Sequence, residues 1–242
     1  MQAIKIQGLT KKYKDITAVD DLSLSIESGE LFSLLGVNGA GKTTTIKMLC
    51  GLIQPTDGDA FLMGHSLRSD SAIVKSIIAV SPQETAVAHG LTVKENLELM
   101  CGVHGLGADK KKERMSQLTE LLGIKDVLQR KAGKLSGGWQ RRLSIAMALI
   151  SEPEILFLDE PTLGLDVIAR SELWSVISSL KGKVTTVLTT HYMQEAEALS
   201  DRIGIMKEGR LLLTGTADDI KRMAATDNFE EAFIRIVKGE IK

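Results

Sequence analysis

The N-terminal part of the chain shows the alternation of apolar and polar positions that is typical of β-strands. The alternation covers residues 3–7 and 22–26, and residues 31–35 form a nearly continuous apolar run that also predicts a strand. Residues 59–63 and 77–80 read as further strands. These segments predict short strands joined by turns.

Strands and helices alternate in the second half of the chain. The expected order is a strand at 155–158, a helix at 167–180, a strand at 184–189 and a helix at 194–199. A hairpin is then expected around Glu208 and Gly209, followed by a mostly helical segment after Thr216. A helix is also expected at 43–52, directly after the first apolar run. This alternation favours an α/β core with a mostly parallel sheet.

A helical segment interrupts the alternation between about residues 90 and 150. Thr92 is followed three positions later by Glu95, which is the pattern of a capping box before an amphipathic helix. A second amphipathic helix is expected at 110–122 with Gly123 as its C-terminal stop, and a third at 136–150. We therefore expect a helical subdomain inserted into the core, within a single domain that covers residues 1–242.

Composition and charge narrow the class of protein. The chain is 43% hydrophobic and 25% charged with a formal net charge of -1, as in ordinary soluble globular proteins, and we expect no nucleic-acid partner. Cys50 and Cys101 lie in apolar stretches outside any C-x-x-C pattern, which indicates buried, reduced thiols rather than metal ligands. The sequence has neither an apolar run long enough to cross a bilayer nor the pattern of a secretion signal. A role at a membrane would therefore need another subunit.

A glycine-rich loop follows the apolar run at 31–35 and matches G-x-x-x-x-G-K-[ST] with Gly36-Val37-Asn38-Gly39-Ala40-Gly41-Lys42-Thr43. Glycines let the main-chain amides of such a loop turn inward around an anion, and the helix that starts there adds its positive end. Lys42 is expected to reach the β- and γ-phosphates, Thr43 to bind Mg²⁺ and Thr44 to contact the α-phosphate. The loop predicts that the chain binds a nucleoside triphosphate, ATP, and hydrolyses it.

Two acids end the predicted strand at 155–158. In this architecture the end of a buried strand lies beside the phosphate loop, so Asp159 is expected to hold the coordination shell of Mg²⁺ in place. Glu160 is expected to orient or deprotonate the attacking water.

Two further segments narrow the class of protein, and the first of them has no obvious use within the chain's own phosphate site. Leu135-Ser136-Gly137-Gly138 opens a helix, and a Ser-Gly-Gly helix start binds phosphate well. His191 follows the strand at 184–189, where it could face the γ-phosphate.

Together and in this order, these motifs resemble the nucleotide-binding subunits of ATP-binding cassette (ABC) transporters over nearly the whole chain. The resemblance implies a P-loop NTPase core with a mostly parallel sheet, an N-terminal antiparallel β-subdomain, an inserted α-helical subdomain and a short helical tail at 216–242. It also implies that Tyr13 stacks on adenine, and that Gln83 contacts Mg²⁺ and senses the membrane partner. Asp166 matches the D-loop aspartate and His191 the switch histidine. Trp139 stands where the family most often has Gln, but the Ser and Gly residues needed for phosphate contact remain.

The resemblance further implies two such domains paired head to tail with two ATP molecules between them. Each ATP would lie on the phosphate loop of one domain and under Ser136, Gly137 and Gly138 of the other, with Asp166 nearby. We expect the second ATP-binding subunit to be an identical chain and the other partners to be integral-membrane transporter subunits. The chain would then be a cytoplasmic protein, peripheral on the cytoplasmic face of the membrane.

The finer class is read from two stretches of sequence. The residues Asn-Gly-Ala-Gly-Lys-Thr-Thr-Thr in the loop and Thr-His-Tyr-Met-Gln-Glu-Ala-Glu at the switch look like the branch that exports drugs, peptides, lipids, polysaccharides or sodium. The alternative is a non-transport ABC ATPase that acts on nucleic acid or the ribosome. A P-loop GTPase is disfavoured because no Asn-Lys-x-Asp segment is present, and a P-loop kinase because it has no need of residues 135–138.

Overall fold

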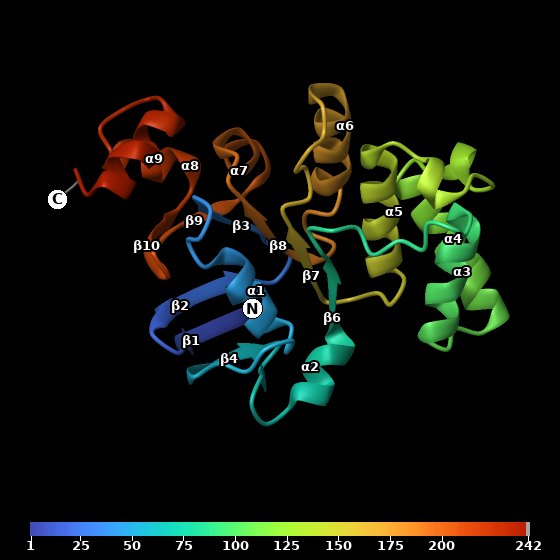
Figure 1. The fold of residues 1–242 in the computed structure, drawn as a ribbon, viewed down its shortest axis with the longest axis horizontal. Coiled ribbons are helices and arrows are strands. Elements are labelled where there is room, and N and C mark those ends of the chain that lie inside the picture. Colours follow the sequence, from blue (N-terminus) through green and yellow to red (C-terminus); the bar gives the residue numbers. More distant parts are fainter. Residues whose placement is uncertain (241–242) are drawn as a thin grey trace.

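A six-stranded sheet forms the centre of the computed structural model, which describes residues 1–240 (Figure 1). Its strand order is β10-β9-β3-β8-β7-β6, with antiparallel pairing only between β10 and β9. The strands are β3 (Leu31–Gly36), β6 (Ile78–Ser81), β7 (Ile155–Asp159), β8 (Thr185–Thr190), β9 (Arg202–Lys207) and β10 (Arg210–Gly215). The prediction of an α/β core with a mostly parallel sheet is confirmed.

A second sheet, fully antiparallel, is built from the N-terminal strands in the order β2-β1-β4-β5. These strands are β1 (Gln2–Tyr13), β2 (Ile16–Glu27), β4 (Asp57–Leu62) and β5 (His65–Ser66). β1 and β2 are much longer than the alternating segments indicated. Register shifts between Ile6 and Leu9 and between Leu9 and Lys11 break the simple alternation along β1, which explains why the sequence revealed only part of each strand.

Helix α1 (Lys42–Leu49) lies between the two sheets and contacts β2 on one side and β3 and β7 on the other. Ile46, Met48 and Leu49 are buried in a core shared with both sheets. The helix ends earlier than the predicted residue 52, because Gly51 adopts a left-handed conformation (φ +64°) directly after the helix.

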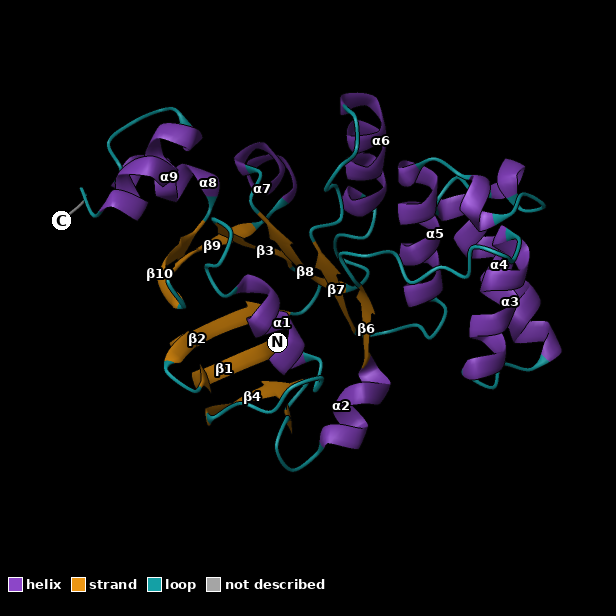
Figure 2. Cartoon of the chain, viewed as in Figure 1, coloured by secondary structure: helices purple, strands orange, loops and turns teal. Residues whose placement is uncertain are grey.

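The predicted helical subdomain is present at one end of the molecule, on the right in Figure 2. It consists of α3 (Val93–Val103), α4 (Ala108–Leu121) and α5 (Gly137–Leu149), with short 3₁₀ turns at Lys125–Val127 and Ala132–Lys134. The capping box is formed: the Thr92 hydroxyl accepts from the Glu95 amide, while the Glu95 carboxylate accepts from the Thr92 amide. Gly123 follows α4 with φ +63°, as expected of a helix stop.

Helix α2 (Ser71–Ile77) was not predicted, and it takes up Ile77, which the sequence had assigned to the next strand. Val74 is its one buried residue, so the helix carries no apolar stripe that would reveal its period. The remaining helices are α6 (Val167–Ser178), α7 (Met193–Leu199), α8 (Ala217–Met223) and α9 (Phe229–Lys238). The last two residues of the predicted tail, 241–242, lie outside the described part of the chain.

Helices α8 and α9 pack near β9 and β10, the two strands at one end of the large sheet. Phe229, Phe233 and Ile236 of α9 pack with Ile203 and Ile205 of β9 in a separate core cluster. The hairpin between β9 and β10 turns at Glu208 and Gly209, both with positive φ, as the sequence indicated. Within residues 1–240, no helix combines the length and apolar character needed to cross a bilayer.

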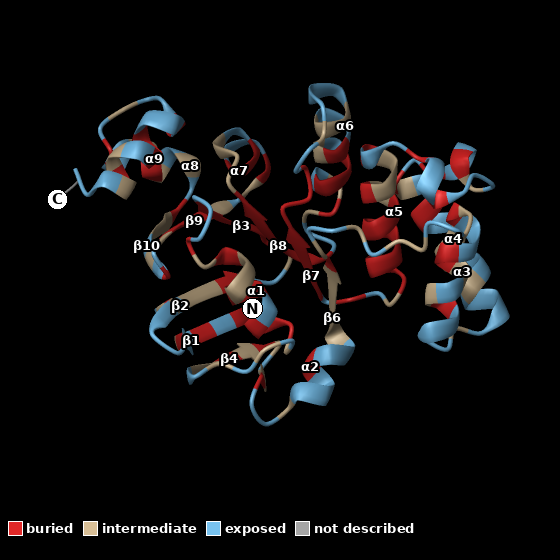
Figure 3. Cartoon of the chain, viewed as in Figure 1, coloured by how far each residue is buried: buried red, intermediate tan, exposed pale blue. Residues whose placement is uncertain are grey.

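The parallel pairing of β3, β7 and β8 determines where the chemistry lies. All of their residues are buried (Figure 3), and their carboxyl ends meet at one edge of the sheet, where ligands of open α/β sheets bind. The glycine-rich loop leaves β3 at this edge, the two acids end β7, and His191 follows β8.

Because the Thr92 cap closes α3 at the start of the helical subdomain, we expect Thr92→Ala to destabilise the protein by about 1 kcal/mol. For a chain of this size that corresponds to a fall in Tm of about 2–4 °C. Differential scanning calorimetry measures the change. Ser116→Ala, which removes an exposed hydroxyl within α4, is the matched control, and an equal loss in both variants would contradict the capping role.

Candidate nucleotide-binding site

The glycine-rich loop can follow its path only because two of its positions lack a side chain. Gly41 has φ +103°, and a Cβ there would lie 2.5 Å from the Ala18 carbonyl oxygen. At Gly36 a Cβ would lie 2.5 Å from the Met206 carbonyl oxygen. Gly41 also caps α1 without a side-chain hydrogen bond, so the positive end of the helix faces the loop and favours an anion.

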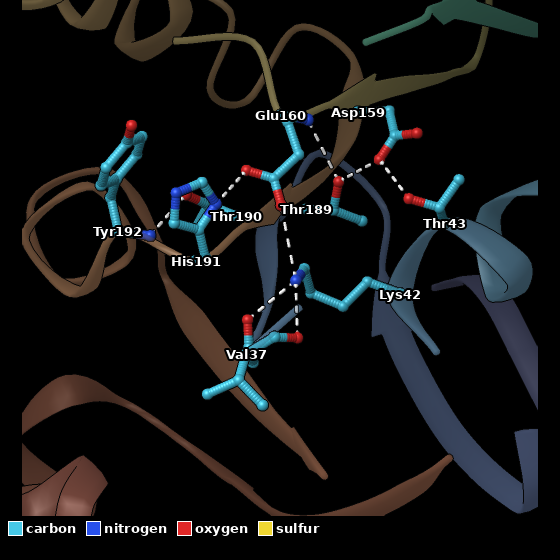
Figure 4. Close-up of polar contacts among 10 residues, drawn as sticks. Val37, Lys42, Thr43, Asp159, Glu160, Thr189, Thr190, His191 and Tyr192 are labelled. Carbon is cyan, nitrogen blue, oxygen red and sulfur yellow. Dashed lines mark hydrogen bonds and ion pairs between the residues drawn. The ribbon is translucent and has the colours of Figure 1, made fainter. Parts of the chain in front are cut away.

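Lys42 is buried, and its ammonium group lies at the centre of the site (Figure 4). Its Nζ donates to the Gly36 carbonyl at 2.8 Å and to the Val37 carbonyl at 3.3 Å. The same nitrogen lies 3.4 Å from Oε1 of Glu160. The lysine thus links the phosphate loop to the acid at the end of β7.

Asp159 joins three elements through one carboxylate oxygen. Oδ1 accepts from the Thr43 hydroxyl of α1 at 3.2 Å and from the Thr189 hydroxyl of β8 at 2.5 Å. These bonds fix the carboxylate of β7 beside the first residues of α1. Asp159 and Thr189 are both buried.

Glu160 adopts a left-handed backbone conformation with φ +50°, which is uncommon for a residue other than glycine. Its amide donates to both the carbonyl and the hydroxyl oxygen of Thr189, each at 3.1 Å. The carboxylate is buried between two basic groups: Oε1 faces Lys42, and Oε2 lies 2.7 Å from Nδ1 of His191. Strained backbone of this kind is concentrated at functional sites, where neighbouring structure holds it in place.

Lys42, Thr43, Glu160 and His191 line one pocket of about 300 Å³, and Asp159 lies outside its lining. The lining residues are Asn38, Gly39, Ala40, Gly41, Lys42, Thr43, Thr44, Gln83, Glu160, Leu163 and His191. Every one of them except Leu163 was singled out from the sequence. Residues from β3 to β8 are therefore brought together as the motif order indicated.

The chemistry of the lining suits a nucleotide phosphate with a divalent cation. Main-chain amides of the loop, the helix N-terminus and the Lys42 ammonium are all groups that bind phosphate. The Thr43 hydroxyl and the Gln83 amide oxygen of the lining are hard oxygen donors, which Mg²⁺ prefers. The Asp159 carboxylate, which is not part of the lining, is a third such donor and is bonded to the Thr43 hydroxyl.

Tyr13 does not line this pocket. It lies at the end of β1 with 46% of its surface exposed, and the Lys11 ammonium stands 5.0 Å from its ring centroid. Its predicted role in stacking on adenine stays a prediction.

Residues 136–138 and Asp166 form a second group outside the pocket. Ser136 occupies the N-cap position of α5, where its side chain makes no capping hydrogen bond. A Cβ at Gly138 would stand 3.1 Å from that of Ala169 in α6. Asp166 caps α6 by accepting from the Ala169 amide at 2.9 Å. The starts of α5 and α6 therefore lie side by side.

Three residues that the sequence analysis passed over contribute to the site. Thr189 donates to the Asp159 carboxylate and accepts from the Glu160 amide. Arg141 donates to the main-chain carbonyls of Pro82 and Gln83. Glu195, in the first turn of α7, is fully buried and accepts from Nε1 of Trp174 in α6 at 3.1 Å. The local signal for Thr189 was the pair of threonines, Thr189 and Thr190, that ends the buried strand β8.

Burial raises the pKa of the Glu195 carboxyl above its ordinary value of 4.5. The hydroxyls of Thr190 and Thr162 and the Trp174 indole oppose this shift, while the negative charge of Glu160 adds to it. A carboxyl with a raised pKa in the folded state binds its proton more tightly there than in the unfolded chain. Its contribution to stability is therefore complete below about pH 4.5 and is lost as pH rises towards the folded-state pKa.

We accordingly expect Glu195→Gln, which stays neutral at all pH values, to gain stability over the parent as pH rises above 4.5. The gain should be on the order of 1 kcal/mol at pH 8, because a buried charge with an incompletely bonded oxygen is removed. Thermal melts between pH 4 and pH 8 give the difference directly, with the exposed Glu230→Gln as control. A difference independent of pH would show that folding does not shift the pKa of Glu195, which would contradict the raised value.

The fold and this pocket define an α/β nucleotide-binding domain with its phosphate loop at the carboxyl end of the sheet. Comparison with known families then identifies it more closely. The family model described as ABC transporter matches residues 19–163, which is more than half of the chain. The protein belongs to the ABC transporter family and is an ATP-binding domain of that family.

Similar proteins agree with this assignment. The chain is 41% identical over 97% of its length to "Probable multidrug ABC transporter ATP-binding protein YbhF" of Escherichia coli (strain K12), but spans only 41% of that relative. It is 40% identical over 94% of its length to "Daunorubicin resistance ATP-binding protein DrrA3" of Streptomyces coeruleorubidus, and covers 72% of it. A solved "ATP binding subunit of ABC transporter" superposes over 97% of this chain and 99% of its own with a TM-score of 0.85 at 28% identity.

Proposed function

We propose that this chain, acting as one domain over residues 1–242, binds and hydrolyses MgATP and so drives an ABC transporter. The observation that carries the proposal is the position of Glu160. Its buried carboxylate lies between Lys42 and His191 and lines the same pocket as the phosphate loop. That is where a group that orients or deprotonates the attacking water must stand.

The roles of the surrounding residues follow from their contacts. His191 holds one oxygen of Glu160, which fixes the direction of the carboxylate. Lys42 pairs with the other oxygen, and a γ-phosphate would compete with Glu160 for this ammonium. The carboxylate would then be released towards water only when the nucleotide is in place. Thr43, Asp159 and Gln83 would hold Mg²⁺, which neutralises charge on the phosphate oxygens when bound.

The head-to-tail dimer is supported by the second group of residues. Ser136–Gly138 offers a helix N-terminus suited to phosphate, yet none of these residues lines the chain's own pocket. Next to this group, Val167 and Ile168 expose 78% and 73% of their surfaces. Exposed apolar side chains beside a phosphate-binding helix start suit contact with a second, identical subunit. Ser136 would then complete the ATP-binding site of that subunit.

Export through integral-membrane subunits is the form of transport that the relatives favour. YbhF is described as a probable multidrug ABC transporter protein and DrrA3 as a daunorubicin resistance protein. Both descriptions favour a role in transport over a role that acts on nucleic acid or the ribosome. The chain would then work at the cytoplasmic face of the membrane, with ATP-driven closure of the dimer passed to the membrane subunits near Gln83.

We expect Glu160→Gln to lower the rate of steady-state ATP hydrolysis at least about a hundredfold. The substitution removes the carboxylate that orients or deprotonates the attacking water but keeps a side chain of nearly the same size. ATP binding should persist, and the variant should accumulate as an ATP-bound dimer. Phosphate release and size-exclusion chromatography with ATP measure the two effects.

Lys42→Ala is the contrasting variant for this experiment, since it should lose tight ATP binding itself in a calorimetric titration. Turnover close to that of the parent in Glu160→Gln would remove Glu160 from the catalytic role.

Ser136→Ala tests the shared site. We expect hydrolysis to fall by roughly tenfold to a hundredfold, because one donor to the phosphate of the partner subunit is lost, while the ATP affinity of the monomer stays unchanged. Ser178→Ala, at an exposed serine on α6, is the matched control. If Ser136→Ala hydrolyses ATP at the parent rate, the sandwich arrangement is wrong.

A further inference from the structure

One face of α5 is attached to the segment that carries Gln83. Arg141 and Ser144 are three residues apart, so their side chains lie on the same face of the helix. Ser144 shares a hydrogen bond of 2.9 Å with the Ser81 hydroxyl at the end of β6. Arg141 reaches the next two residues along the chain, Pro82 and Gln83.

The two bonds of Arg141 are directed at main-chain oxygens. Nη1 donates to the Pro82 carbonyl at 2.5 Å and Nη2 to the Gln83 carbonyl at 2.6 Å. A planar guanidinium that bonds two consecutive carbonyls fixes both the position and the orientation of that peptide segment. Because the Gln83 carbonyl is held, the side chain of Gln83 leaves the backbone from a defined point at the edge of the nucleotide pocket.

Within the described part of the chain, the guanidinium of Arg141 is a buried positive charge with no carboxylate beside it. The residue is 5% exposed, and among residues 1–240 no carboxylate lies within 4.0 Å of it. Burial lowers the pKa of its guanidinium, while the more distant charges of Asp159 and Glu195 oppose that shift. A buried cation without an adjacent counter-ion is costly, so a role in simple packing would be served better by an apolar side chain.

We propose that Arg141 is a positioning residue for Gln83, through which α5 sets how well the pocket holds Mg²⁺. The inference rests on the proposed function, in which Gln83 contacts the cation and α5 begins at Ser136–Gly138. A displacement of α5 is then transmitted to Gln83 by a rigid link. The phosphate contact that the chain makes to its partner's nucleotide is in this way coupled to the cation site of its own pocket.

A double-mutant cycle on the full chain tests the link. The variants are Arg141→Met, which keeps much of the length and removes every donor, Gln83→Ala, and the two combined. The measured quantity is the Mg²⁺ concentration at which ATP gives half of its maximal protection against thermal unfolding. We expect each single variant to raise this concentration at least about threefold, and the double variant to match the larger single effect within about 1.5-fold, because both act through one group.

Two more variants keep the experiment decisive. Arg141→Lys retains one donor and should fall between the parent and Arg141→Met; it replaces Arg141→Met in the cycle if that variant fails to fold. Ser144→Ala breaks the neighbouring attachment but leaves the Gln83 carbonyl bonded, so its Mg²⁺ midpoint should equal that of the parent.

Three results would overturn the inference. The first is an unchanged Mg²⁺ midpoint in Arg141→Met or Arg141→Lys, and the second is a fold-change in the double variant equal to the product of the fold-changes of the two single variants. The third is a shift of the midpoint in Ser144→Ala as large as that in Arg141→Met. The readout does not need turnover. Failure of the proposed hydrolysis, seen with Glu160→Gln, is therefore distinguishable from failure of the link.

Discussion

The hydroxyl group of Thr189 is the contact on which the geometry of the site depends. It donates to Asp159 and accepts from the amide of Glu160, so a single side chain of β8 holds both acids at the end of β7. The pairing of β7 with β8 places this hydroxyl opposite Asp159. Without that bond the left-handed backbone of Glu160 would lose a main source of support, and its carboxylate would no longer be fixed between Lys42 and His191.

The parts of the site that could be predicted are those with a local signature. Gly36 and Gly41 are required by the path of one short loop, and Asp159 and Glu160 end an apolar strand that the sequence displays openly. The alternation of strands and helices likewise depends on short stretches of chain, and the central sheet follows from it. Helix α2 was missed because it has almost no buried face.

The remaining contributors act across long separations in sequence. Arg141 bonds to a carbonyl 58 residues away, and Trp174 bonds to Glu195 across 21 residues. In the sequence, Arg141 reads as one of two neighbouring arginines on a helix. Glu195 reads as an ordinary acid in a first turn, where acids are common. Only the packing of α5, α6 and α7 against the sheet shows that both are buried.

The position of β3 has a consequence for how the protein is made. This largely apolar strand ends at Gly36, but the strands on either side of it begin only at Thr185 and Arg202. During synthesis β3 therefore emerges from the ribosome long before either neighbour exists, with both of its edges unpaired. A nascent chain of this kind must form contacts between residues far apart in the sequence, and it exposes an apolar strand with unpaired edges. Both features favour aggregation before folding is complete. The same placement that centres the phosphate loop in the sheet thus leaves β3 without either neighbouring strand until most of the chain has been synthesised.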